Sequence, residues 1–101
     1  MEIIAQIVEK IDDELKDAKN YIKLAYEMKD KYPSLADAYY KLSVEEMGHA
    51  TILHDQVVNV INDIKRTNPT IPQGMQMFYD YLHEKQIRKA AKIKAKQDSY
   101  K

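Results

Sequence analysis

The chain has 101 residues, no cysteine and a formal net charge of zero. This length fits one small domain, and the lack of cysteine excludes disulfides and thiolate metal sites. Only two glycines and three prolines interrupt runs rich in Ala, Leu, Ile, Lys and Glu, which is a composition typical of an all-α protein, so we expect no sheet.

Charge is unevenly distributed along the chain. Residues 1–64 contain 13 acidic and 7 basic side chains, whereas residues 85–101 contain 7 basic side chains and one acidic one. Dispersed lysines beside an acidic body are typical of a solvated helix face, so we do not expect nucleic acid as a partner. No apolar run approaches the roughly 18 residues of a membrane span, and acids rather than bases accompany the first apolar residues, so we expect a cytoplasmic protein without a membrane segment.

The first predicted helix extends from Glu2 to about Lys31. Its apolar side chains recur in steps of three and four, as a packed helix face requires. Position 14 of this series is occupied by an acid, Glu14. The helix should end before Pro33, because proline disfavours helical geometry in the residue that precedes it. The members of the series are Ile4, Ile7, Ile11, Ala18, Tyr21, Ala25 and Met28.

The second predicted helix extends from Ser34 to about Arg66. Ser34 and Asp37 form a pair similar to a capping box, in which the serine would satisfy free amide donors at the helix start. Two polar residues, Glu46 and His49, occupy the centre of the expected core-facing row. That row consists of Leu35, Tyr39, Leu42, Glu46, His49, Leu53, Gln56 and Val60, widened by Val57, Ile61 and Ile64.

Residues 67–74 contain two prolines and a glycine and are predicted to form a linker, which divides the chain into a hairpin (1–66), the linker and a C-terminal basic helix (75–101). The last helix should cover about residues 75–96, with Met75 and Met77 packed against the hairpin. Beyond Ile87 its apolar face thins among lysines, so we expect the last turns to be exposed or frayed.

Two long helices joined by a tight turn predict an antiparallel hairpin. With the turn at residue 32, Glu14 lies 18 residues before it, and Glu46 and His49 lie 14 and 17 residues after it. The three side chains should therefore lie at nearly the same height. Carboxylates in an apolar seam cost several kcal/mol unless they are paired or bind a metal, and oxygen ligands with one imidazole suit Fe, Mn or Zn.

These residues resemble part of a known family. Glu14, Tyr21 seven residues later and the segment Glu46-Met47-Gly48-His49-Ala50 look like the first half of the ferritin-like fold of rubrerythrins and encapsulated ferritins. The resemblance covers roughly residues 8–60. It implies a homodimer that completes a four-helix bundle, because this chain lacks the second Glu and the second Glu-x-x-His of that fold.

The resemblance also implies a function. Two copies would supply two Glu14, two Glu46 and two His49 as ligands and catalytic residues for two iron ions per dimer, with Mn or Zn as other occupants. The activity would be ferroxidase-type oxidation of Fe(II), or a peroxidase-like reaction. Tyr21 and Tyr39 would lie behind the ligands or simply pack in the core. The C-terminal tail does not resemble a shell-targeting peptide, so residence in a protein shell stays open but is doubtful.

Two alternatives remain open at the level of sequence. The polar cluster could set helix register in a non-enzymatic oligomerisation or interaction module, or it could hold a redox-inert Zn or Ca ion as a staple. Asp13, Asp17 and Glu45 are predicted to be solvated. His54 lies about 140° around the helix from His49 and is predicted to be a surface residue.

Overall fold

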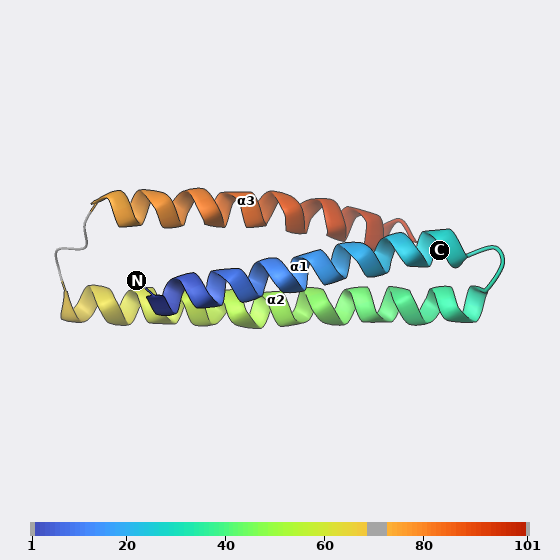
Figure 1. Cartoon of the computed structure of the whole chain (residues 1–101), viewed down its shortest axis with the longest axis horizontal. Coiled ribbons are helices and arrows are strands. Elements are labelled where there is room, and N and C mark those ends of the chain that lie inside the picture. The colour runs from blue at the N-terminus through green and yellow to red at the C-terminus, as the bar shows by residue number, and fades with distance from the viewer. Residues whose placement is uncertain (1, 69–72, 101) are drawn as a thin grey trace.

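The computed structural model describes residues 2–68 and 73–100, and these residues form three helices and no strand. The helices are α1 (Glu2–Met28), α2 (Pro33–Thr67) and α3 (Gln73–Asp98). Helices α1 and α2 form an antiparallel hairpin, and α3 runs back beside it in the same direction as α1 (Figure 1). The all-α prediction with three helices is confirmed. Within the described ranges, no helix combines the length and the apolarity needed to cross a membrane.

The turn between α1 and α2 differs from the prediction by a few residues. Helix α1 ends at Met28 rather than near Lys31, and the amide of Tyr32 donates to the Met28 carbonyl at 2.8 Å. Helix α2 begins at Pro33, with Tyr32 as its N-cap and no side-chain cap. The prediction that Ser34 caps this helix is therefore wrong, because the fixed φ of Pro33 already suits the first helical position.

The predicted linker is shorter than residues 67–74. Thr67 is the last residue of α2, where the Asn68 amide donates to the Ile64 carbonyl at 2.7 Å, and Gln73 and Gly74 already belong to α3. Residues 69–72 of the predicted linker lie outside the described residues. Helix α3 continues to Asp98, two residues beyond the predicted end.

The contact between α1 and α2 is built on a row of small side chains in α2. The row follows a spacing of seven residues, so its members lie on one side of the helix, and α1 can approach closely there. The buried residues of this contact are Ala36, Ser43, Ala50 and Val57 from α2 and Ile11, Leu15, Ala18, Ile22 and Ala25 from α1. The predicted centre of the α2 row is wrong, since Leu35 and Leu42 are 42% and 36% exposed. The prediction placed the large Leu35 and Leu42 in the core, whereas the residues that follow them, Ala36 and Ser43, are the buried ones.

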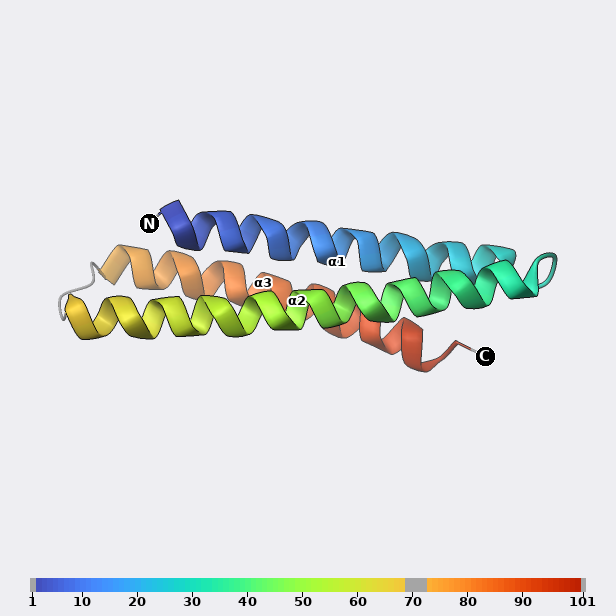
Figure 2. The same cartoon turned by 90° about the horizontal axis from the view of Figure 1, so that it is seen from below.

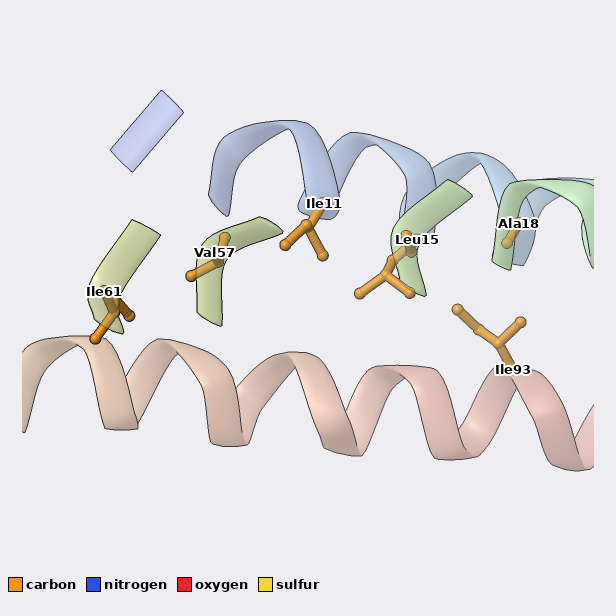
Figure 3. Close-up of a cluster of buried hydrophobic side chains, with 7 residues drawn as sticks. Ile11, Leu15, Ala18, Val57, Ile61 and Ile93 are labelled. Carbon is orange, nitrogen blue, oxygen red and sulfur yellow. The ribbon is translucent and has the colours of Figure 1, made fainter. Parts of the chain in front are cut away.

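Helix α3 attaches to the hairpin through one buried aliphatic residue and several hydrogen bonds. Ile93 points from α3 towards Leu15 and Ala18 of α1 (Figure 3). Closer to the middle of the helix, the buried Gln86 donates from Nε2 to the Val8 carbonyl at 3.2 Å and to Asp12 Oδ1 at 3.1 Å. A neutral amide thus links α3 to α1 where apolar residues are scarce.

The last turns of α3 are firmly docked, so the prediction that they are exposed or frayed is wrong. Gln97 Nε2 donates to Ser43 Oγ at 2.8 Å, and Ser43 Oγ donates to the Ala18 carbonyl at 2.7 Å. One chain of hydrogen bonds therefore joins all three helices inside the core. The Tyr26 hydroxyl also donates to the Lys96 carbonyl at 2.8 Å, and the Tyr100 ring stacks on Tyr40.

The first turns of α3 pack less closely. Met75 lines an apolar cavity of about 270 Å³ together with Ile4, Ile61 and Leu82. Met77 is 63% exposed, so the prediction that it packs against the hairpin is wrong for this residue. The start of α3 leaves apolar surface uncovered, in contrast to its end.

Candidate metal centre

The hairpin has two grooves between α1 and α2, one on each side. Helix α3 covers one side, as the two views together show (Figure 1 and Figure 2). We call that side the closed groove; Asp12 of α1 and His54 of α2 contact α3 there. Glu14 lies about 200° around α1 from Asp12, and His49 lies about 140° around α2 from His54. Glu14, Glu46 and His49 therefore face the opposite side, which we call the open groove.

The structure brings Glu14, Glu46 and His49 together in the open groove. His49 Nδ1 is 3.6 Å from Glu14 Oε2 and 3.5 Å from Glu46 Oε2, and one ligand atom from each residue lies within 4.8 Å of the others. The two glutamate side chains are 26% and 18% exposed, and the His49 side chain is 54% exposed. The carboxylates therefore lie at the edge of the core, and the imidazole closes the cluster on the solvent side.

These separations suit an ion better than a direct hydrogen bond. An N–H···O bond measures about 2.7–3.2 Å, so both contacts of His49 Nδ1 are longer than that. Ligand atoms about 2.0–2.1 Å from a common metal lie roughly 3.0–3.4 Å apart, so the two contacts of His49 Nδ1 are only slightly longer than the spacing of ligands around one ion. The donor set of two carboxylates and one imidazole therefore fits Fe, Mn or Zn.

Two carboxylates meet a single imidazole in this cluster. Glu46 and His49 lie one turn apart on α2, and Glu14 adds a second carboxylate from α1. Two carboxylates that share one imidazole repel each other, and a bound cation relieves that repulsion. The arrangement is therefore suited to a divalent ion with further ligands from outside the chain.

The open groove continues on either side of the cluster with apolar and aromatic residues. Leu35, Leu42 and His49 follow one another at intervals of seven, so they form one exposed row along α2. Tyr21 and Tyr39 stack on each other with ring centres 6.1 Å apart. Among the described residues, neither hydroxyl makes a hydrogen bond to Glu14 or Glu46. The placement of these tyrosines behind the ligands remains a prediction.

Sequence reasoning missed one polar contact on the other side of the hairpin. His54 was predicted to lie at the surface, yet its side chain is only 35% exposed and its Nε2 lies 2.6 Å from Nε2 of His83 in α3. A signal was present in the sequence, because Tyr40, Met47 and His54 are also spaced by seven, and this row faces α3. The prediction overlooked the row because it mixes aromatic, apolar and titratable residues.

Comparison with known proteins does not assign a family. No family model, no curated protein and no solved structure matches this chain. The function therefore has to be inferred from the residues and their geometry.

Proposed function

We propose that two copies of this chain associate through their open grooves and build a di-iron centre that oxidises Fe(II), with oxygen or peroxide as the oxidant. The observation that carries this proposal is the convergence of ligand atoms from Glu14, Glu46 and His49 within 4.8 Å of one another. The convergence joins residues from two helices at an edge of the core. A cluster of surface acids would not require a histidine three residues after one of its glutamates, whereas a carboxylate-bridged metal site does.

A second copy supplies what one chain lacks. One chain offers three ligand side chains, whereas two iron ions need about eight or more coordination positions. A two-fold axis through the open groove doubles each ligand and makes the same surface face itself. The exposed Leu35 and Leu42, in line with His49, support this arrangement because the pairing would bury them. The dimer would then be a four-helix bundle of two hairpins.

The residues of the chain have distinct tasks in this proposal. Glu14 and Glu46 supply negative charge that attracts Fe(II) and compensates the ferric product, and His49 supplies one neutral nitrogen per ion. Iron, when bound, would supply the redox chemistry, since two Fe(II) can together give the two electrons that reduce oxygen to hydrogen peroxide or peroxide to water. The apolar residues beside the cluster exclude water and fix the carboxylates. Manganese fits the same ligands, and zinc would fill the site without redox chemistry.

Iron binding tests the proposal directly. The full chain is dialysed against Fe(II) without oxygen, and iron per chain and the mass of the assembly are measured. The parent should bind about one Fe(II) per chain as a dimer or larger assembly, and oxygen should then be consumed. A Glu46→Ala, His49→Ala double variant should lose both properties. Glu45→Ala is the matched control, because Glu45 is an exposed neighbour outside the cluster, and it should behave as the parent.

Two results would contradict the proposal in different ways. Equal iron binding by the parent and the double variant would rule out this cluster as the site. Stoichiometric binding without oxygen or peroxide consumption would rule out the oxidase activity and leave a metal staple.

One observation favours a second candidate, a helical interaction module without catalysis. His49 Nδ1 lies at ion-pair distance from both carboxylates, so a protonated imidazole could itself set the register of a dimer. This candidate predicts that the dimer survives chelators and that Glu14→Leu stabilises it. Loss of the dimer on chelation would exclude it.

A further inference from the structure

A second pair of metal-binding side chains lies in the closed groove. His54 of α2 and His83 of α3 have their Nε2 atoms 2.6 Å apart, while their ring centres are 4.5 Å apart and their planes differ by 25°. The two nitrogens are closer together than the ring centres, so each ring turns its Nε2 towards the other ring. One imidazole must donate a proton and the other must accept it.

The surroundings of His83 favour its neutral form. Burial lowers the pKa of His83, the nearby His54 lowers it further, and Asp80 opposes both effects. The ring of Tyr79 stacks on His83 with centres 5.7 Å apart. The pair borders an apolar cavity of about 360 Å³ that is also lined by Leu15 and Met47. Neutral imidazole is the form that binds metals.

A carboxylate lies on the other side of the His54 ring. Asp55 Oδ1 is 3.8 Å from His54 Nδ1, which is longer than a hydrogen bond, so this contact does not fix the tautomer. With the proton on His54 Nδ1, His83 is the donor in the Nε2–Nε2 contact. Histidines that bind metals generally direct their other ring N–H at a carboxylate or carbonyl, and Asp55 offers a carboxylate on the Nδ1 side of His54.

We propose that His54 and His83 bind one divalent transition metal that prefers imidazole ligands, of which Cu²⁺ binds most tightly and Zn²⁺ and Ni²⁺ less so. The metal takes the place of the shared proton, and His83 moves that proton from Nε2 to Nδ1, so no net proton is released. Nitrogens about 2.0–2.1 Å from one metal are roughly 3.0–3.4 Å apart, so the two rings separate by less than one ångström. Water fills the remaining positions, since His54 is partly exposed.

This site is independent of the proposed iron centre. It lies in the other groove, its ligands come from α2 and α3 rather than from α1 and α2, and it contains no carboxylate ligand. Its consequence is mechanical. Between α2 and α3 a bound ion joins the middle of α2 to the first half of α3, where packing is loose, and so it holds that half of α3 against the hairpin.

Copper binding tests the site in a background that removes the iron centre. The chain contains three histidines, so in the full-length Glu46→Ala, His49→Ala variant only His54 and His83 remain. Titration with Cu²⁺ should show one tight site per chain, and the electron paramagnetic resonance spectrum should show coupling to two imidazole nitrogens. Adding His83→Gln or His54→Asn should weaken Cu²⁺ binding at least about tenfold. Both replacements keep a hydrogen-bonding side chain, and circular dichroism checks that the helices persist.

The outcomes separate this proposal from the first. Unchanged Cu²⁺ affinity in either single replacement, or coupling to only one nitrogen, would overturn it. If one of the two variants fails to fold, the other variant is used for the titration. The melting temperature is a second measurement: Cu²⁺ should raise it in the Glu46→Ala, His49→Ala variant and should not raise it once His54→Asn is added. Failure of iron binding in the parent leaves the copper result unaffected, because the titration is done without His49.

Discussion

The two grooves of the hairpin contain polar residues of different kinds. In the closed groove, the buried Ser43, Gln86 and Gln97 are neutral, and each is hydrogen-bonded to another part of the chain. In the open groove, Glu14 and Glu46 are acids whose common neighbour is an exposed imidazole. Both grooves interrupt an apolar seam with polar groups, but the closed groove joins them by neutral hydrogen bonds and the open groove by longer contacts between acids and an imidazole.

The difference shows how to interpret a polar residue in a helical seam. A neutral amide or hydroxyl with a hydrogen-bond partner at about 2.7–3.2 Å on another helix fixes how the helices of one chain are aligned. Two acids that share one imidazole at longer distances repel each other, and a bound cation would relieve that repulsion. The neutral polar residues of the closed groove are therefore satisfied within one chain, whereas under the proposed function the open groove is one half of a contact between two copies.

Placing a charge in the open groove should have the largest effect. Leu42→Lys would place an ammonium in the proposed dimer contact, which costs several kcal/mol and should weaken dimerisation by about 100-fold or more. The control is Val44→Lys, at a similarly exposed position about 200° around α2. Sedimentation of both variants with Fe(II) measures the effect. Equal loss of the dimer in both would contradict the assignment of the contact surface.

Weakening the closed groove should destabilise each chain without affecting iron. Ile93→Ala removes the buried aliphatic anchor of α3 and should lower the free energy of unfolding by about 2–4 kcal/mol, measured by urea denaturation. Iron binding per folded chain should remain. Ile87→Ala, at an exposed position in the same helix, should cost less than about 1 kcal/mol. A loss of iron affinity in Ile93→Ala would show that the grooves are coupled.

The hydrogen-bond chain across the core predicts a smaller and non-additive effect. Ser43→Ala leaves the amide of Gln97 and the carbonyl of Ala18 without their partner and should cost about 1–3 kcal/mol. Adding Gln97→Leu should recover part of the loss, because an unpaired buried amide is then replaced by an apolar group. A double-mutant cycle in urea measures the coupling, and additive losses would show that the two residues do not act together.

The smallest effect on the metal-free chain is expected in the open groove. Glu14→Gln removes one ion-pair partner at the edge of the core and should change the free energy of unfolding by less than about 1 kcal/mol in the presence of a chelator. The same variant should lose most of the stabilisation that Fe(II) or Mn²⁺ gives the parent. Thermal melts of both proteins with chelator and with metal measure the loss of stability without metal and the stabilisation that metal adds. A large loss in the chelated protein would instead favour a structural role for Glu14.

The sequence predicted the open groove better than the closed one. The meeting of Glu14 with Glu46 and His49 followed from counting residues on either side of the turn, because a long hairpin has a fixed rise per residue and small errors at its ends matter little. The metal and the second copy remain proposals. The apolar periodicity of α1 also located Ile11, Ala18 and Ala25 in the core.

The packing of α3 could not be predicted because its contacts do not have an apolar signature. Its docking depends on Gln86, Gln97 and Ile93, which stand among lysines and arginine. Side chains of this kind are normally exposed, and only the partner on the other helix reveals their role. Ser43 was not predicted to be buried for a similar reason: serine is normally exposed, so the prediction assigned the core position to the neighbouring Leu42.

The position of α3 on the far side of the hairpin would determine the layering of the proposed assembly. If hairpins pair through their open grooves, the two α3 helices become the outer layers of a six-helix sandwich, and the acidic hairpins become its middle. The lysine-rich end of the chain would then coat the outside, together with the exposed Tyr81 of α3. Growth beyond a dimer would have to start from those outer layers, leaving the metal-binding middle intact.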